Sequence, residues 1–270
     1  MAFVGTMTHT HAQSRLSPVT LYRVGAALLL LALWESAGAS GLFFKGVLPS
    51  TLLIGKSMIR LLGDPVFWGH FNVTLFEICS GFAIGSALGV TAGLALGMNR
   101  YTGQVLEPVV EYLAATPKVV FLPILLILFG IGVGSKISLA ALSCFFPMTL
   151  SLAAGVRGIN PMFVRVGQTL NLSLAQRIRM IYLPALVPPI STGLRLGFGI
   201  ATVGSLLSEI KLSNKGLGHA AMQAYARFDI PTMMAILIVI FALAGLGNTL
   251  IGRVVRLPGP HTRPSTKDQT

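Results

Sequence analysis

Residues 73–98 read VTLFEICSGFAIGSALGVTAGLALGM. This stretch contains one charged residue, Glu77, and it is long enough to cross a bilayer, which takes about 20 mainly apolar residues in a helix. Backbone groups in lipid must find hydrogen-bond partners within the protein, so a helix is the expected conformation. The stretch therefore predicts a membrane-spanning helix.

Glycine recurs at every fourth position of this stretch, so five glycines would share one helical face. Without side chains, such a face lets a second helix approach closely, and van der Waals contact then holds the pair together. The repetition favours a packed helix pair, formed within the chain or with a second copy, over a chance excess of glycine. The predicted packing residues are Gly81, Gly85, Gly89, Gly93 and Gly97.

Five other apolar stretches accompany the first, so the chain is predicted to be an all-α polytopic membrane protein with about six transmembrane helices. The 105–129 stretch is interrupted by Pro117 and Pro123. The 21–38 stretch has a second interpretation as a cleavable signal peptide, because small residues follow its apolar centre. The remaining stretches are 137–156, 188–210 and 231–251.

The expected domain organisation is one transmembrane domain, residues 21–255, between two cytoplasmic tails. The tails are residues 1–20 and 256–270. With an inside N-terminus, 12 of the 20 Lys and Arg residues fall on the inner side and 7 on the outer side, while Lys118 falls within a span. This distribution favours cytoplasmic N- and C-termini.

Composition excludes several classes of protein. Charged residues make up only 10% of the chain, against about a quarter in soluble domains, and hydrophobic residues make up 53%. The net charge of +12 is therefore attributed to cytoplasmic loops and lipid headgroups rather than to nucleic acid. Two cysteines and five scattered histidines form no metal-binding pattern, and no catalytic motif is visible.

The polar stretch 157–185 carries the most functional information. Asn160 can cap a helix whose first residue is Pro161, and apolar residues then recur at Phe163, Val166, Leu170 and Leu174. The pattern predicts a short amphipathic helix on the cytoplasmic face. Such a helix could rest on lipid headgroups or fit into the groove of a partner protein.

The same stretch resembles the cytoplasmic loop of binding-protein-dependent ABC transporter permeases. That family's loop reads Glu-Ala-Ala, three residues, Gly, nine residues, Ile, one residue and Leu-Pro. Ile181, Leu183 and Pro184 match it, whereas Asn171 stands at the Gly position. Arg165, Val166 and Gly167 stand at the Glu-Ala-Ala positions.

The resemblance extends over about residues 30–255 and is closest to permeases for nitrate, sulfonate, taurine and pyrimidine precursors. Further matching patterns are Trp34-Glu35, Leu48-Pro49-Ser50, Glu209 and Gly216-Leu217-Gly218. The resemblance implies a bacterial inner-membrane importer subunit that pairs with a second permease copy, as a homodimer or a heterodimer. It also implies an extracytoplasmic solute-binding protein and two ATP-binding subunits that receive the loop.

The chain has no phosphate-binding loop of its own, so it is not expected to be an enzyme; ATP and Mg would bind on the partner subunits. Arg165 cannot reproduce the charged contact that the family's Glu makes with the ATPase. Pro184 is expected to set the turn into the fifth span. An ion-gradient-driven transporter, a membrane enzyme and a non-transporting scaffold remain the alternatives.

Charged residues inside the spans are the remaining candidates, because each is costly in lipid. Glu35 and Glu77 are expected at the outer interface, exposed to water. Lys118 could attract an anionic solute, or it could snorkel or pair with Glu111. Glu209 could make a helix-end contact or touch the solute. Lys118 and Glu209 are therefore the candidate residues of a substrate pathway.

Overall fold

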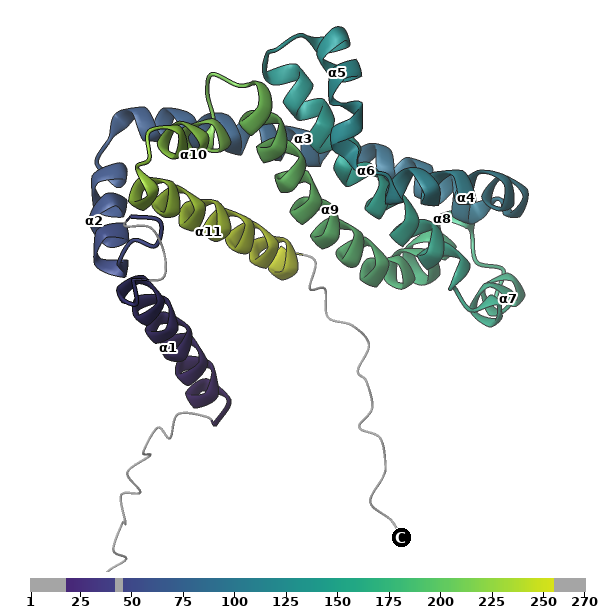
Figure 1. Ribbon diagram of the computed structural model, residues 1–270. Coiled ribbons are helices and arrows are strands. Elements are labelled where there is room, and N and C mark those ends of the chain that lie inside the picture. Colours follow the sequence, from purple (N-terminus) through teal and green to yellow (C-terminus); the bar gives the residue numbers. More distant parts are fainter. Residues whose placement is uncertain (1–17, 42–45, 255–270) are drawn as a thin grey trace, which may run out of the picture. The chain divides into compact units, whose positions relative to one another are not determined.

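The computed structural model describes residues 18–41 and 46–254. Within these residues every regular element is a helix (Figure 1). The elements are α1 (Pro18–Ala39), α2 (Thr51–Leu62), α3 (Pro65–Met98), α4 (Arg100–Ala115), η1 (Lys118–Phe121), α5 (Leu122–Phe129), α6 (Val133–Arg157), α7 (Pro161–Thr169), α8 (Leu174–Arg177), η2 (Ile178–Tyr182), α9 (Leu183–Leu212), α10 (Leu217–Ala226) and α11 (Ile230–Val254).

The chain divides into two compact units, residues 1–54 and 55–270. In the first unit, the end of α1 is tied to the segment that follows it. The Trp34 indole donates a hydrogen bond to the Pro49 carbonyl at 3.0 Å, and the Glu35 carboxylate accepts from the backbone N–H of Thr51 at 2.6 Å. The Trp-Glu and Leu-Pro-Ser patterns of the sequence are therefore two sides of one contact.

In the second unit, α3 and α6 run parallel and in close contact. A Cβ added at Gly81 would lie 2.5 Å from the Cβ of Ala140, and one added at Gly97 would lie 2.6 Å from that of Val156. Residue numbers thus rise in the same direction along both helices, which makes the pair parallel. Helix α9 runs antiparallel to α6, because Gly204 lies against Ser143 and Gly193 lies against Met148.

Because α3 and α6 point the same way, the chain between them must return across the same thickness. Helix α4 and the η1–α5 segment make this return, with a bend of 94° at the break near Pro117. The described residues contain five helices that are long and apolar enough to cross a membrane, or six if the bent pair is one span. The predicted all-α fold with about six spans is confirmed.

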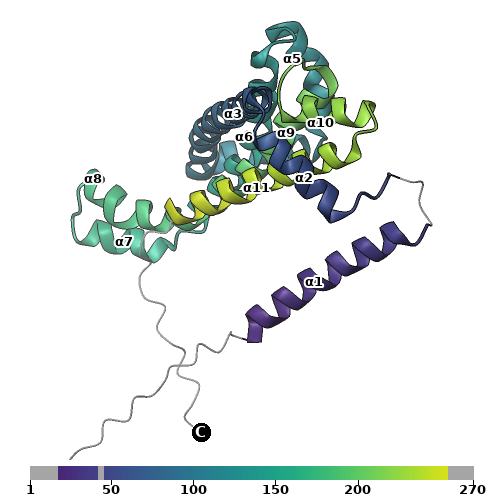
Figure 2. The same cartoon turned by 90° about the vertical axis from the view of Figure 1, so that its left-hand side faces the viewer.

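Helices α10 and α11 close the second unit. Phe67 of α3, Leu217 and Ala221 of α10, and Ile236 and Ile240 of α11 form one buried apolar cluster. Within this unit, α7 and α8 lie at the opposite end from α10 in both views (Figures 1 and 2). The polar 157–185 segment and the α9–α10 turn are therefore on opposite faces of the unit.

Two boundaries differ from the sequence prediction. Helix α3 begins at Pro65, before the predicted residue 73, because the Asp64 carboxylate accepts from the Val66 N–H at 2.9 Å and Pro65 suits the first turn. Helix α9 begins at Leu183 and contains Pro188 and Pro189, where the prediction started the span at residue 188. The predicted tails lie almost entirely outside the described residues.

Candidate functional site

The 157–185 segment folds as a short helical hairpin. Helix α7 begins as the sequence predicts: the Asn160 side chain accepts from the Met162 N–H at 2.9 Å, and Pro161 occupies the first helical turn. The helix ends at Thr169, so the amphipathic period that extends to Leu174 covers two helices separated by a turn. The chain then re-enters a helix at α8.

Asn171 makes this turn in a left-handed conformation, with φ at +51°. Glycine adopts such a conformation without a steric penalty, and asparagine tolerates it better than most other residues do. This is the position at which the resembled motif has glycine. The departure from the motif therefore keeps the backbone geometry that the turn requires.

Gly167 is buried on the inner side of the hairpin. A Cβ at this position would lie 2.7 Å from the Cδ1 atom of Ile181, and the Gly167 carbonyl accepts from the Leu172 N–H at 3.0 Å. The small residue and the isoleucine of the motif thus contact each other. A bulky residue at Gly167 would act first on the hairpin's own packing, rather than on a partner surface alone.

The expected turn at Pro184 is absent. The π-helical segment η2 continues directly into α9, with Leu183 in a helical conformation and its N–H bonded to the carbonyl of Ile178. Proline lacks a backbone donor and crowds the carbonyl of the preceding turn. The wider π-helical turn immediately before Pro184 accommodates both effects without breaking the helix.

The outer side of α7 presents large apolar side chains. Met162, Phe163, Val166 and Leu170 are exposed over roughly half to two thirds of their surface, and Arg165 is exposed among them. Leu183, at the start of α9, is also half exposed. A surface of this kind on a short, capped helix is typical of helices that dock into grooves.

The five ladder glycines all lie against α6. Besides the contacts at Gly81 and Gly97, added Cβ atoms at Gly85, Gly89 and Gly93 would come within 2.3 Å, 2.7 Å and 2.7 Å of atoms of α6. The partner helix is thus in the same chain. This contact fixes the α3–α6 pair, which carries charged groups at one end.

At the end opposite the hairpin, three charged residues from three helices meet in the interior. We refer to Glu77 of α3, Lys136 of α6 and Glu209 of α9 as the buried charge cluster; both carboxylates have no exposed surface. The Lys136 Nζ atom lies 3.5 Å from the Glu77 carboxylate and donates to the Ser213 hydroxyl at 2.6 Å. The expectation that Glu77 is exposed at the interface is wrong, because it lies on the face that packs against α6.

Glu209 binds the turn that follows its own helix. Its carboxylate accepts from the Thr74 hydroxyl at 2.6 Å and from the Gly218 N–H at 2.6 Å, and Thr74 in turn accepts from the Leu217 N–H at 2.7 Å. Gly216 has φ at +106°, and a Cβ there would lie 2.3 Å from the Glu209 carboxyl carbon. The Gly-Leu-Gly pattern therefore wraps the chain around this carboxylate.

Lys118 lies apart from the buried charge cluster. Its Nζ atom donates to the carbonyls of Ala114 and Thr116 at the end of α4, and it lies 5.2 Å from the centre of the Phe146 ring. No ion pair with Glu111 is formed within the described part of the chain. The structure therefore does not bring Lys118 and Glu209, the two predicted pathway residues, together.

Sequence reasoning missed Lys136, Thr74 and Ser213, which it placed in loops or passed over. A signal was available for Glu77, the ion-pair partner of Lys136, because Glu77 lies four residues before Gly81 and so continues the glycine face. Lys136 follows Gly134 closely in the sequence, and this position favours an outer loop. Only the packing of α3 against α6 shows that it is buried.

Comparison with known proteins assigns the family. The sequence profile of the binding-protein-dependent transport system inner membrane component family matches residues 85–264, two thirds of the chain. The chain belongs to this permease family. The permease is thus a subunit of an ABC importer and a multi-pass protein of the plasma membrane.

Individual relatives agree with this assignment. The permease is 30% identical over 217 residues to a Bacillus subtilis protein assigned to aliphatic sulfonate transport as a permease, covering 80% of this chain and 78% of that one. It is 28% identical over 228 residues to the taurine transport system permease protein of Escherichia coli, covering 83% of each.

A solved structure supports the fold. A chain of the MetNI methionine ABC transporter, in inward-facing conformations, aligns with the permease at a TM-score of 0.59 and 18% identity. The alignment covers 74% of this chain and 96% of that chain. The family assignment favours an importer subunit over the ion-gradient transporter, membrane enzyme and scaffold alternatives.

Proposed function

We propose that the permease forms, as a homodimer, the membrane pathway for a small anionic solute such as a sulfonate. An extracytoplasmic binding protein delivers the solute, and two ATP-binding subunits, each carrying ATP and Mg, supply the energy. The relatives assigned to aliphatic sulfonate and taurine transport support the solute class.

The exposed apolar side of α7 is the observation that carries the central part of this proposal, the coupling of the permease to the ATP-binding subunits. Met162, Phe163, Val166 and Leu170 would be costly to leave in water, and the hairpin that holds them is fixed internally by Gly167 and Ile181. A rigid helix with an apolar outer side can transmit movement from a partner to the span that follows it. The continuous passage from η2 into α9 provides that connection.

Arg165 indicates which kind of side chain to expect in the groove of the ATP-binding subunit. It is exposed among the apolar side chains of α7 and stands where the resembled motif has Glu. We expect an acidic residue of the ATP-binding subunit to lie opposite Arg165. Arg165→Glu should then weaken the association of that subunit, and a compensating acid-to-base change in the subunit should restore it.

Within the pathway, we assign Lys118 and Glu209 different roles. Glu209 holds the α9–α10 turn, since its oxygens are fully buried and engaged by Thr74 and Gly218. Lys118 is partly buried, donates to the carbonyls at the end of α4 and lies 5.2 Å from the centre of the Phe146 ring. It remains our candidate for attracting the anion.

The test is co-purification of the ATP-binding subunit with Phe163→Asp, together with sulfonate uptake in cells. The substitution places a charge in the proposed contact, so we expect normal membrane insertion, loss of the ATP-binding subunit and loss of uptake. Phe228→Asp is the matched control, because Phe228 is also highly exposed but lies in the connection before α11, at the opposite end. An undiminished ATP-binding subunit with Phe163→Asp would remove α7 as the docking element.

A further inference from the structure

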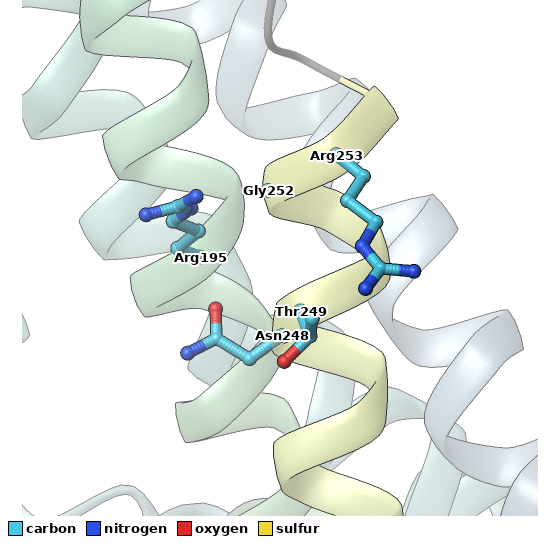
Figure 3. Close-up of a pocket in the computed structure, with 5 residues that line it drawn as sticks. All are labelled: Arg195, Asn248, Thr249, Gly252 and Arg253. Carbon is cyan, nitrogen blue, oxygen red and sulfur yellow. The ribbon is translucent and has the colours of Figure 1, made fainter. Parts of the chain in front are cut away.

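A basic pocket lies between α9 and α11, away from the residues discussed so far. We refer to it as the Arg195 pocket; it encloses about 390 Å³ and is lined by Arg195, Asn248, Thr249, Gly252 and Arg253. Figure 3 shows Arg195 on α9 and the other four residues on α11, with Asn248 on the side of α11 that faces Arg195 and Arg253 on the other side. Arg195 and Asn248 therefore lie on the facing sides of the two helices, whereas the Arg253 guanidinium extends away from Arg195.

The position of Arg195 is built into the packing of the two helices. A Cβ added at Gly252 would lie 2.0 Å from a guanidinium nitrogen of Arg195, so the absence of a side chain at Gly252 makes room for that group. One turn further along α9, the Phe198 ring lies over Gly247 in the same way, where an added Cβ would be 2.3 Å away. Gly252 and Gly247 of α11 thus leave the space that the side chains of Arg195 and Phe198 of α9 occupy.

The pocket lacks a counter-charge. It is lined by two arginines and no acidic residue, and neither arginine takes part in the ion pairs found in the described part of the chain. The Thr249 hydroxyl donates to the Gly245 carbonyl at 2.7 Å, whereas the Asn248 amide has no hydrogen-bond partner among the described residues. The Arg195 guanidinium and the Asn248 amide together offer several donors to one oxyanion.

The level of the pocket along α9 and α11 indicates the source of that oxyanion. At 1.5 Å per residue, Gly252 lies about 33 Å from Ile230, and Arg195 lies about 26 Å from Leu212. Ile230 and Leu212 lie at the same end of the helix pair, because α9 and α11 are antiparallel. With Leu212 and Ile230 at the outer boundary of the hydrocarbon core, a core thickness of about 30 Å places the pocket at the level of the headgroups on the side of α7.

We propose that the Arg195 pocket binds the phosphate of an anionic lipid headgroup in the inner leaflet. Arginine matches the geometry of phosphate oxygens, and basic pockets between transmembrane helices on the cytoplasmic side suit anionic lipid headgroups. A soluble oxyanion shares this chemistry, but the position at the bilayer boundary favours the lipid. The proposal does not depend on which solute the permease carries.

The test measures the association of phosphatidylglycerol, relative to phosphatidylcholine, with the complete transporter in nanodiscs. Arg195→Gln should lower this preference well beyond the roughly fivefold loss that removing any one cation near an anionic surface causes. Arg195→Lys should keep most of the preference. Arg100→Gln is the matched control, since Arg100 is an exposed cation of α4 outside the pocket, and it should cause no more than that roughly fivefold loss.

Gly252→Val separates the geometry of the pocket from net charge, because it removes no cation but displaces the Arg195 guanidinium. We expect it to reduce the lipid preference as strongly as Arg195→Gln does. An equal loss with Arg100→Gln, or no loss with Gly252→Val, would overturn the proposal. So would binding of inorganic phosphate in phosphatidylcholine nanodiscs that requires Arg195, if no preference for phosphatidylglycerol is found.

Discussion

Asn171 shows how a single position can depart from a motif and keep its geometry. The φ angle of +51° costs most residues about 1–2 kcal/mol, and glycine pays none of this penalty. We therefore predict that Asn171→Val loosens the α7–α8 turn by about that amount, whereas Asn171→Gly leaves it as stable or more stable. Hydrogen exchange of residues 160–182 measures the difference, and equal protection in both variants would contradict the prediction.

Lys136 is the residue on which the buried charge cluster depends. It is the one cation near Glu77 and Glu209 within the described residues, and removing one partner of a buried ion pair leaves an uncompensated charge. We predict that Lys136→Met destabilises the permease by about 3–5 kcal/mol. Thermal unfolding of the purified transporter in nanodiscs measures this loss.

The double variant Glu77→Gln with Lys136→Met serves as the control for this prediction. It removes one negative and one positive charge together, so we expect it to recover a large part of the lost stability. If the double variant were as unstable as Lys136→Met alone, the loss would come from packing or from the Ser213 hydrogen bond, and the electrostatic explanation would be wrong.

At the scale of the helices, the α3–α6 contact allows the sharpest comparison, because α3 contains glycines in two different settings. Gly85 faces the Ala141 backbone, and an added Cβ would lie 2.3 Å from its carbonyl oxygen, whereas Gly69 has no atom within 4 Å. We predict that Gly85→Ala destabilises the permease by about 1–3 kcal/mol through overpacking. Gly69→Ala should stabilise it by about 0.5–1 kcal/mol, because alanine favours the helix.

Both variants are compared by the apparent melting temperature of the transporter in nanodiscs. They make the same chemical change in the same helix, so helix propensity and hydrophobicity are matched and only the neighbouring helix differs. A similar shift for both would mean that the glycine face does not set the distance between α3 and α6.

The elements also show what the sequence could and could not predict. Apolar length predicted the spans, the four-residue spacing predicted the packed face of α3, and Asn160 with Pro161 predicted the start of α7, because each signal is local. The burial of Lys136 and the contact between Gly167 and Ile181 depend on which helices meet, so no local pattern reveals them. The uninterrupted passage through Pro184 was missed because a π-helical turn leaves no clear sequence signal.

At the scale of the whole molecule, helix direction constrains the topology of residues 55–254. Helices α3, α6 and α11 point one way and α9 points the other, as their glycine contacts show. The hairpin of α7 and α8 therefore lies at the same membrane face as the C-terminal ends of α3, α6 and α11. That face also carries Arg157, which forms an ion pair with Glu107 of α4.

The distribution of cations favours a cytoplasmic position for this face, and the family's ATP-binding subunits would have to reach it there. We therefore predict that both chain termini are cytoplasmic and that the α9–α10 turn is external. The test is cysteine labelling with an impermeant reagent, using Thr10→Cys, Ser265→Cys and Asn214→Cys in a background with Cys79 and Cys144 replaced by alanine. Asn214 is exposed in the α9–α10 turn and should react in intact cells.

An even number of membrane crossings places both ends of the chain on the same side of the membrane. Positions 10 and 265 should therefore react only after the membrane is permeabilised. Labelling of position 265 in intact cells would invert the assigned orientation and would place α7 outside, beyond the reach of any ATP-binding subunit. Labelling of position 10 alone would instead show that α1 does not cross the membrane, because the order of α3 to α11 is fixed by their contacts. Retained uptake in each cysteine variant ensures that the labelled protein has its working fold.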